Sequence, residues 1–396
     1  MRRALTGLGT DGQGAVMNRP TTFDNETKMN IKRAYKTKLD PNNVQRGYFS
    51  ACAGTARFVF NWALADRIEM FEAGGKPNKF EQKRRFNAWK KSNAPWIVNY
   101  PYTISAEEFD HVDVAYQNFF RRIKQGSDKP GFPRFKSRHR DKQSFTLRGN
   151  ITVEDNRIRL PKMGWVRLAE AGYIPTEDVK ILFVVISRTA DDWFVSVQVE
   201  QEIPDPQPAQ GAPLGVDMGI KSLAVCSDGT TFDNPLALRK YERKMARLQR
   251  ELNRRTKGSN NRQKTKEKIA ALHQTIANVR RHTQHNISRH ATATTKPSTV
   301  VIEDLNVKGM MANHKLAKDV GDVGMGELRR QIEYKAAWNG VSVLVADRWF
   351  ASSKTCSKCG NVKETLTLSE RVYRCEVCGA ELDRDLNAAL NLAALA

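Results

Sequence analysis

Three acidic residues stand far apart in the chain, each at the end of a predicted strand or inside a short acidic motif. Asp217 lies in LGVDMGIKSLAV, Glu303 ends the apolar run of TVVIEDLN, and Asp385 lies in LDRDLNAALNLA. Carboxylates at strand ends are the usual way to hold two divalent ions for phosphodiester hydrolysis, because such ions clamp the attacking water and the leaving oxygen. Oxygen-only ligands suit Mg²⁺, so the pattern predicts two Mg²⁺ (or Mn²⁺) ions.

Each of these acids also has an ordinary structural interpretation. Asp217 could cap a turn, and Asp383 or Asp385 could cap the helix that follows them. Alternation along a strand sends Glu303 and Asp304 to opposite sides, so only one of the two should face a shared site. From the residues alone, the choice between Asp383 and Asp385 stays open.

A cysteine cluster lies between the second acid and the third. Cys356, Cys359, Cys375 and Cys378 form two C-x2-C pairs separated by fifteen residues, which is the spacing of a tetrahedral zinc site. A glycine follows each pair and lets backbone N–H groups turn toward sulfur. Four thiolates leave no open position on the metal, so we expect one structural Zn²⁺ ion rather than a catalytic one.

The charge indicates a polyanionic partner. The 396 residues include 65 Lys and Arg against 43 Asp and Glu, a formal net charge of +22. Residues 239–289 contain sixteen Lys or Arg and three Asp or Glu, which favours a surface that follows a nucleic-acid backbone. Neither a long apolar run nor a secretory leader is evident, so we expect a cytoplasmic protein without a membrane partner.

The pattern of predicted elements places the acids in the C-terminal half. A strand at 31–39 is followed by a helical block over 41–125 and by a strand-rich region over 144–202, which together indicate a small barrel or sandwich with a helical insertion. A proline-rich linker covers 203–213. Beyond it we expect a strand hairpin around Asp217, further strands at TVVIED and 341–347, and a helical hairpin from 236–256 and 262–295.

Taken together, the motifs resemble the TnpB family of transposon-encoded RNA-guided DNA nucleases, the compact relatives of type V CRISPR effectors. GVDMGIKSLAV, VVIEDLNVKGM, GELRRQIEYKAAWNG, RWFASSKTCSKCG and CEVCG…DRDLNAALN match the nuclease motifs in order. GTARFVFNWALADR, YQNFFRRIKQG, KPGFPRFKSR and RIRLPKMGWVRL match upstream. The resemblance covers about residues 31–394.

The resemblance implies an α+β multidomain fold. A wedge β-barrel interrupted by a helical recognition domain precedes an RNase H-like (RuvC) nuclease interrupted by a zinc ribbon. The expected boundaries are 1–28 for a disordered extension, 29–40 and 129–205 for the wedge barrel, 41–128 for the helical insertion, 206–213 for the linker, 214–349 and 383–396 for the nuclease with its hairpin at 236–295, and 350–382 for the ribbon.

The resemblance also implies an activity. It assigns Asp217, Glu303 and Asp385 as the catalytic triad, which decides between Asp383 and Asp385. A guide RNA from the transposon end would pair with double-stranded target DNA beside a short adjacent motif, and the displaced single strand would enter the nuclease. We expect a monomer on one RNA, associated with the nucleoid of a prokaryotic cell.

Two groups of residues are candidates for nucleic-acid contacts. Positions near the adjacent-motif duplex should be Phe80, Arg84, Tyr102, Thr103 and Ala106, with ordinary helix packing as the alternative. Arg348 and Lys354 flank an aromatic pair beside the zinc site and could hold a phosphate while an aromatic ring stacks on a base. Large aromatics more often pack inside, so we expect Trp349 and Phe350 to be core residues of the ribbon.

Other functions share parts of this pattern. A compact type V CRISPR effector would use the same chemistry with a CRISPR-derived guide. A non-cleaving regulator of the same lineage would have lost an acid, whereas all three are present. A strand-transfer transposase would share the RNase H-like core but would need no guide.

Overall fold

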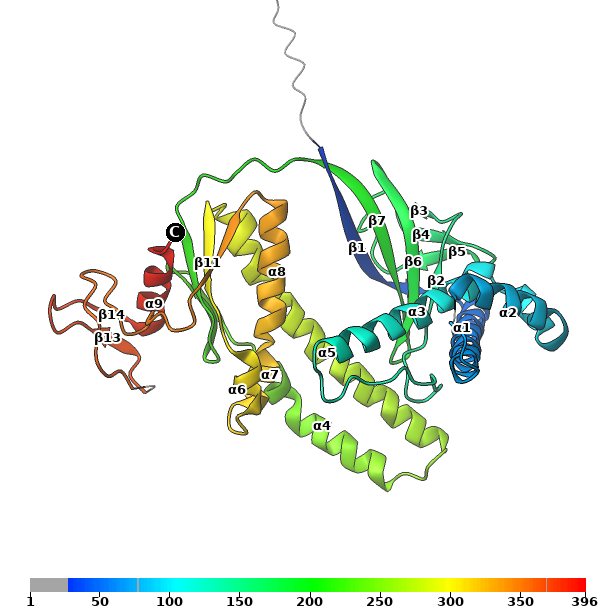
Figure 1. Ribbon diagram of the computed structural model, residues 1–396. Helices are drawn as coiled ribbons and strands as arrows, with labels where there is room; N and C mark the ends of the chain where they lie inside the picture. Colours follow the sequence, from blue (N-terminus) through cyan, green and yellow to red (C-terminus); the bar gives the residue numbers. More distant parts are fainter. Residues whose placement is uncertain (1–27, 77, 368) are drawn as a thin grey trace, which may run out of the picture.

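The protein forms two lobes joined by an extended linker, with a long helical hairpin reaching from one lobe to the other (Figure 1). The computed structural model describes residues 28–76, 78–367 and 369–396. The N-terminal extension expected to be disordered lies outside the described residues, except for Lys28. Within the described ranges, no helix has both the length and the apolar character needed to cross a membrane.

The first lobe is built on a sheet whose first strand is separated in sequence from the others. Strand β1 (Lys28–Asp40) pairs antiparallel along its length with β7 (Asp192–Pro204), and its last residues pair with β5 (Gly164–Leu168). In the described part of the chain the order is β2-β6-β7-β1-β5-β4-β3. The remaining strands are β2 (Ser144–Leu147), β3 (Thr152–Glu154), β4 (Arg157–Leu160) and β6 (Val179–Thr189).

A helical segment interrupts this sheet between β1 and β2. It comprises α1 (Asn43–Glu72), α2 (Lys79–Asn93), the short 3₁₀ helix η1 (Pro95–Asn99) and α3 (Tyr102–Lys124). Their apolar faces form a separate core around Val59, Phe86 and Phe109, each at most 2% exposed. Burial of these faces holds the helices together as a unit.

The second lobe contains a mixed sheet. Among the described residues its order is β10-β9-β8-β11-β12, in which β8, β11 and β12 are parallel neighbours and β8, β9 and β10 are antiparallel. The strands are β8 (Leu214–Asp217), β9 (Ser222–Cys226), β10 (Thr231–Asp233), β11 (Thr299–Glu303) and β12 (Ser342–Ala346). The expected strand hairpin around Asp217 is therefore confirmed.

Helices cover both faces of this sheet. Helix α5 (Asn260–Arg289), its π-helical continuation η2 (His290–Thr294) and α8 (Met325–Trp338) share one apolar core with β8 and β11. Helix α9 (Arg384–Ala393) packs on the opposite face, where Leu392 meets Val301 and Ala346. Two short helices, α6 (Val307–Ala312) and α7 (Ala317–Val323), connect β11 to α8.

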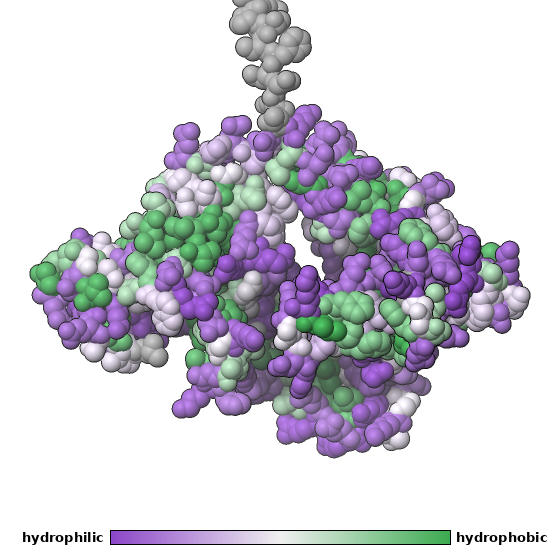
Figure 2. Space-filling model, viewed as in Figure 1, coloured by the Kyte–Doolittle hydropathy of each residue, from purple (hydrophilic) through white to green (hydrophobic). Residues whose placement is uncertain are grey.

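The helical hairpin consists of α4 (Ala237–Arg254) and α5, as the sequence predicts. Met245 and Leu248 on α4 pack against Leu272 and Ile276 on α5. The far end of α5 contacts β6 of the first lobe. Figure 2 shows a hollow between the lobes, bordered largely by hydrophilic residues. A small hairpin of β13 (Val372–Arg374) and β14 (Glu381–Asp383) lies in the segment between β12 and α9.

Candidate functional site

Strand alternation brings Asp217 and Glu303 to the same face of the second sheet. Glu303 lies two residues after Val301, whose side chain packs under α9, and Asp217 lies two residues after Gly215, which faces the same helix. Strands β8 and β11 are parallel neighbours, with Ile302 paired to Val216. The two carboxylates therefore end adjacent strands at one edge of the sheet.

Helix α9 presents the third acid to this edge because it approaches β8 very closely. A Cβ atom built on Gly215 would lie 1.9 Å from the carbonyl oxygen of Ala389 and 2.6 Å from the backbone nitrogen of Ala393. Only glycine allows this backbone-to-backbone contact. The contact fixes where α9 lies over the strand, and Asp385 is in the first turn of that helix.

The electrostatics of Asp217 indicate that Glu303 and Asp385 lie near it. Burial, together with the nearby charges of Glu303 and Asp385, raises the pKa of Asp217 to about 8, while Arg384 opposes the shift. Mutually repelling carboxylates in a desolvated place are the arrangement that a divalent cation stabilises. The donor set, composed of carboxylate oxygens, fits Mg²⁺ or Mn²⁺.

The neighbouring acids already have structural partners. Asp304 accepts from Arg329 Nη1 at 3.2 Å and from Arg348 Nη2 at 2.5 Å, and these arginines, Arg348 first, lower its pKa. Asp383 is the N-cap of α9 and accepts from the backbone N–H of Asp385 at 2.9 Å. Asp383 therefore fills the capping role that the sequence left open for it, and Asp304 is held by two arginines.

Side chains that sequence reasoning missed hold the acids in place. Ser352 Oγ donates to Glu303 Oε1 at 2.5 Å, and Arg384 Nη2 donates to Asp385 Oδ1 at 3.0 Å. Asn391 Nδ2 donates to the carbonyl of Ser352 at 2.8 Å, and Asn387 Nδ2 donates to that of Thr355 at 2.6 Å. The sequence contained a signal for them: two asparagines four residues apart in the otherwise apolar stretch 386–393.

The four cysteines meet as their spacing predicts. Cys356 Sγ lies 3.7 Å from Cys378 Sγ, Cys359 Sγ lies 3.5 Å from Cys375 Sγ, and all four sulfurs lie within 4.8 Å of one another. This separation fits four thiolates around one tetrahedral ion. The cluster is consistent with zinc.

The two cysteine pairs have the same local backbone. Gly360 N–H donates to the Cys356 carbonyl at 2.9 Å, and Gly379 N–H donates to the Cys375 carbonyl at 3.0 Å. Both glycines have positive φ, 75° and 68°, which favours glycine. The backbone N–H of Cys378, with that of Val377, contributes to lowering the pKa of Cys375 to about 6. The turn that the sequence predicts after each cysteine pair is therefore present.

The helical segment displays some of the predicted contact residues. Phe80 and Tyr102 are 69% and 79% exposed, and Arg84 is also exposed. Thr103 is 6% exposed, so its side chain is not available at the surface of this chain. It belongs to the buried face of α3, which explains the difference. Ala106 is half-buried.

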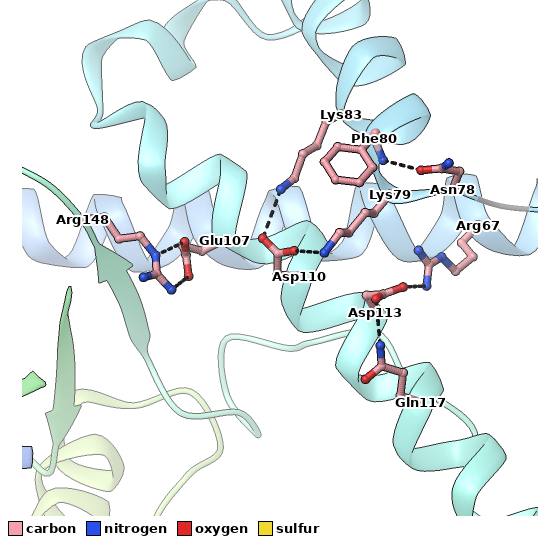
Figure 3. Close-up of polar contacts among 10 residues, drawn as sticks. All are labelled: Arg67, Asn78, Lys79, Phe80, Lys83, Glu107, Asp110, Asp113, Gln117 and Arg148. Carbon is pink, nitrogen blue, oxygen red and sulfur yellow. Dashed lines mark hydrogen bonds and ion pairs between the residues drawn. The ribbon is translucent and has the colours of Figure 1, made fainter. Parts of the chain in front are cut away.

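Ion pairs fix the start of α2, where Phe80 lies. Asp110 on α3 accepts from Lys79 Nζ at 2.9 Å and from Lys83 Nζ at 3.1 Å, on either side of Phe80 (Figure 3). Asn78 Oδ1 accepts from the backbone N–H of Phe80 at 2.9 Å. The aromatic ring is thus held in a defined, exposed position rather than on a loose loop.

The packing of Trp349 and Phe350, the aromatic pair beside the cysteine cluster, differs from what the sequence predicts. Trp349 is 86% exposed, so its prediction as a core residue is wrong. Its backbone N–H donates to Asp347 Oδ1 at 2.8 Å, and in this turn Phe350 packs inward while Trp349 lies outside. Phe350 packs against the second sheet and α9 rather than among the cysteine-cluster residues. Lys354 donates to the Glu364 carbonyl at 2.8 Å.

A basic cleft connects the hairpin to the first lobe. It has a volume of about 870 Å³ and lies between the α4–α5 turn, residues 138–143 and the β6–β7 turn. Its lining includes Arg138, Lys142, Arg188, Arg262 and Lys266, with Asp141 and Glu267 as the acidic members. The surplus of positive charge suits a phosphate backbone.

The sheet-edge acids, the cysteine module and the basic cleft define the class: a nucleic-acid-processing protein with a nuclease-like centre. The chain belongs to the TnpB family. Family models described as "Probable transposase", "Cas12f1-like, TNB domain" and "Helix-turn-helix domain" match residues 195–314, 326–392 and 29–76.

Full-length relatives give the family assignment its strength. The chain is 35% identical over 381 residues to "Putative RNA-guided DNA endonuclease InsQ" of Escherichia coli (strain K12), covering 91% of this chain and 92% of that one. It is 34% identical over 374 residues to a "Putative RNA-guided DNA endonuclease" of Streptomyces pristinaespiralis, covering 92% and 89%.

A solved structure has a similar fold. The protein in "Cryo-EM structure of the Cas12f1-sgRNA-target DNA complex" matches with a TM-score of 0.53 and 15% identity, covering 89% of this chain and 83% of that one. At this level of identity, the similarity concerns the fold.

Proposed function

We propose that this chain is an RNA-guided DNA endonuclease that hydrolyses phosphodiester bonds at the Asp217, Glu303 and Asp385 site. The observation that supports the proposal is that Asp217 and Glu303 end adjacent parallel strands, and that burial with the charges of Glu303 and Asp385 raises the pKa of Asp217. The names of the full-length relatives support the same activity. The second sheet is then the RuvC-like core, and the first is the wedge barrel.

Neighbouring side chains orient the carboxylates that would bind the metal ions. Two Mg²⁺ ions bound by the carboxylates would supply the Lewis acidity that activates water and stabilises the leaving oxygen. Ser352 fixes the Glu303 carboxylate and Arg384 fixes that of Asp385. Such support keeps ligands in the productive geometry.

The basic surfaces are proposed to hold the nucleic acids. A guide RNA from the transposon end would lie along the α4–α5 hairpin and the basic cleft, and the exposed Phe80, Arg84 and Tyr102 would contact the duplex beside the target. Base pairing would supply sequence specificity. A compact CRISPR effector has the same chemistry, so sequencing the co-purified RNA distinguishes the two by the origin of the guide.

The acids can be tested against their own neighbours. Glu303→Gln and Asp385→Asn are expected to lower cleavage of a guide-matched plasmid by about a thousandfold or more, since each removes a metal ligand. Asp304→Asn and Asp383→Asn serve as matched controls, because both acids have structural partners and asparagine is also a good N-cap. They should retain cleavage within about tenfold.

Two results would contradict this assignment. Full cutting by Glu303→Gln or Asp385→Asn removes that residue from the mechanism. As a control, guide and target binding are measured in parallel, because loss of cutting in all variants together with loss of RNA binding indicates a folding defect. A wild type that binds its target but never cuts supports a non-cleaving regulator instead.

The cysteine cluster predicts a metal-dependent ribbon. Cys375→Ser is expected to remove one zinc equivalent per chain and to expose the segment 352–382 to proteolysis, because the ribbon has only a small apolar core of its own. Metal analysis by mass spectrometry and limited trypsin digestion measure both effects. Unchanged zinc content in this variant would contradict a four-thiolate site.

The exposure of Trp349, three residues after the strand partner of Glu303, predicts a stacking role. Trp349→Ala is expected to lower cleavage by about 5- to 150-fold, since stacking on a base is worth roughly 1–3 kcal/mol, and to leave the thermal midpoint unchanged because the side chain is exposed. Trp349→Phe should restore most of the activity. A loss of stability in Trp349→Ala, or equal activity in both variants, would count against stacking.

A further inference from the structure

A second group of metal-ligand side chains lies in the nuclease lobe, apart from the cysteine ribbon. In the described part of the chain, the Cys226 thiol, the Asp228 carboxylate and the His290 imidazole have ligand atoms within 4.8 Å of one another. They come from three places: the end of β9, the turn after it, and η2 at the end of α5. The proposed reaction uses none of them.

The local geometry pre-arranges these ligands. Asp228 Oδ1 accepts from the backbone N–H of Thr230 at 2.9 Å, which leaves Oδ2 to meet His290 Nε2 at 2.8 Å. The His290 ring also packs edge-on against Phe232, with 5.4 Å between the ring centroids. Two bonds of about 2.0 to 2.3 Å at a tetrahedral angle place ligand atoms roughly 3.5 Å apart, so small side-chain movements are sufficient.

The burial pattern leaves one side of the site open. Cys226 is fully buried in the core shared by β8, β9 and α5, whereas the side chains of Asp228 and His290 are 31% and 19% exposed. A bound ion would therefore have protein on one side and solvent on the other. That arrangement provides three protein ligands and room for one water.

We propose that Cys226, Asp228 and His290 bind one thiophilic divalent transition-metal ion, with Zn²⁺ as the best match and water as the fourth ligand. The mixed sulfur, nitrogen and oxygen donor set suits zinc and excludes a preference for Mg²⁺, which takes oxygen ligands. The ion would join the β9–β10 turn to the end of α5. The same turn is hydrogen-bonded to β8, since Gly215 N–H donates to Ser227 Oγ at 3.0 Å.

The proton balance of binding is defined. Cys226 must lose its thiol proton to become a thiolate, and in neutral His290 the proton on Nε2 must move to Nδ1 so that Nε2 can ligate. Binding of one divalent ion to these groups therefore releases one proton, and thiolate plus carboxylate balance its two positive charges. Affinity should rise with pH accordingly.

Zinc stoichiometry tests the site on the full-length protein. After equilibration at micromolar free zinc, the wild type should hold one more zinc per chain than Cys226→Ser or His290→Gln. Cys52→Ser is the matched control: Cys52 is equally buried, burial likewise raises its pKa to about 12, and it lies in the other lobe. This variant should keep the wild-type content. The test compares the zinc contents of variants that all keep the four ribbon cysteines, so zinc bound there does not affect the result.

The absorption of bound Co²⁺ provides a second measurement. Because it detects the site in the wild type itself, it stays informative if a variant does not fold. With the ribbon already filled by zinc, Co²⁺ should give a thiolate-to-cobalt charge-transfer band in the wild type, a weakened band in Asp228→Asn and none in Cys226→Ser. Equal zinc contents in wild type and Cys226→Ser, with no charge-transfer band in the wild type, would overturn the proposal. It would likewise be overturned if Cys52→Ser lost the extra ion instead.

Discussion

Replacing Asp217 with asparagine is expected to abolish cleavage. In the absence of metal, the same substitution is expected to raise the free energy of unfolding at alkaline pH. The first effect follows from the loss of a bridging carboxylate and should reach about a thousandfold or more. The second follows from burial, which together with Glu303 and Asp385 raises the pKa of Asp217 from its ordinary value of 3.8 to about 8. The fold therefore favours the neutral form of this side chain.

The direction of the pKa shift determines the pH range over which the stability of the protein changes. A carboxyl group whose pKa is raised in the folded state contributes stability below its unfolded pKa, and that stability is lost as pH rises through about 8. The asparagine side chain that replaces Asp217 carries no charge, so the advantage of the variant should grow between about pH 4 and pH 8. At 1.36 kcal/mol per pKa unit the gain is on the order of 2 to 5 kcal/mol.

Thermal unfolding in EDTA at several pH values measures this gain. Asp304→Asn is the matched control, because arginine contacts lower the pKa of Asp304 and its loss should bring no gain at high pH. Added Mg²⁺ should stabilise the wild type more than Asp217→Asn, since the cation offsets the repulsion among the acids. A difference between variant and wild type that does not change with pH would contradict a shared, desolvated acid site.

The sequence predicts this site because the relevant signals are local. A buried strand that ends in an acid, or a C-x2-C pair followed by glycine, can be recognised within about ten residues. The hairpin around Asp217 and the strands at Glu303 and 341–347 follow from the same short patterns, and the structure contains them. The parallel pairing of these strands was not predicted. The family resemblance supplied the order of the motifs and the choice of Asp385.

The signals that failed depend on distant contacts. Trp349 and Phe350 are adjacent aromatics, and only the turn at Asp347 determines that one is exposed and the other packs against α9. Ser352 meets Glu303 across 49 positions of sequence. Thr103 lies beside the exposed Tyr102 but on the buried face of α3. Composition and periodicity do not distinguish such neighbours, because tertiary packing decides between them.

Gly215 is expected to be as important for cleavage as the acids, although it has no side chain to contribute. Gly215→Ala places a methyl group where the carbonyl oxygen of Ala389 lies, 1.9 Å from the ideal Cβ position. Backbone atoms on both sides cannot move independently, so α9 must shift as a unit. Asp385 is on this helix, and so are Asn387 and Asn391, which donate to the carbonyls of Thr355 and Ser352. All three residues would move with the helix.

We expect Gly215→Ala to lower the free energy of unfolding by at least about 3 kcal/mol, at the upper end of overpacking costs, and to reduce cleavage to the level of Asp385→Asn. Urea denaturation and plasmid cleavage are the measurements. Gly326→Ala in α8 is the matched control: nothing lies within 4 Å of its added methyl group, so this variant should gain about 0.5–1 kcal/mol from helix propensity.

A second substitution separates this mechanism from ordinary side-chain crowding. Because the clash is with the backbone oxygen of residue 389, trimming the side chain in Gly215→Ala/Ala389→Gly should restore neither stability nor cleavage. Rescue by the double variant would show that Gly215 faces the Ala389 methyl group instead of the helix backbone. The close approach of α9 to β8 would then not be what brings Asp385 to Asp217 and Glu303.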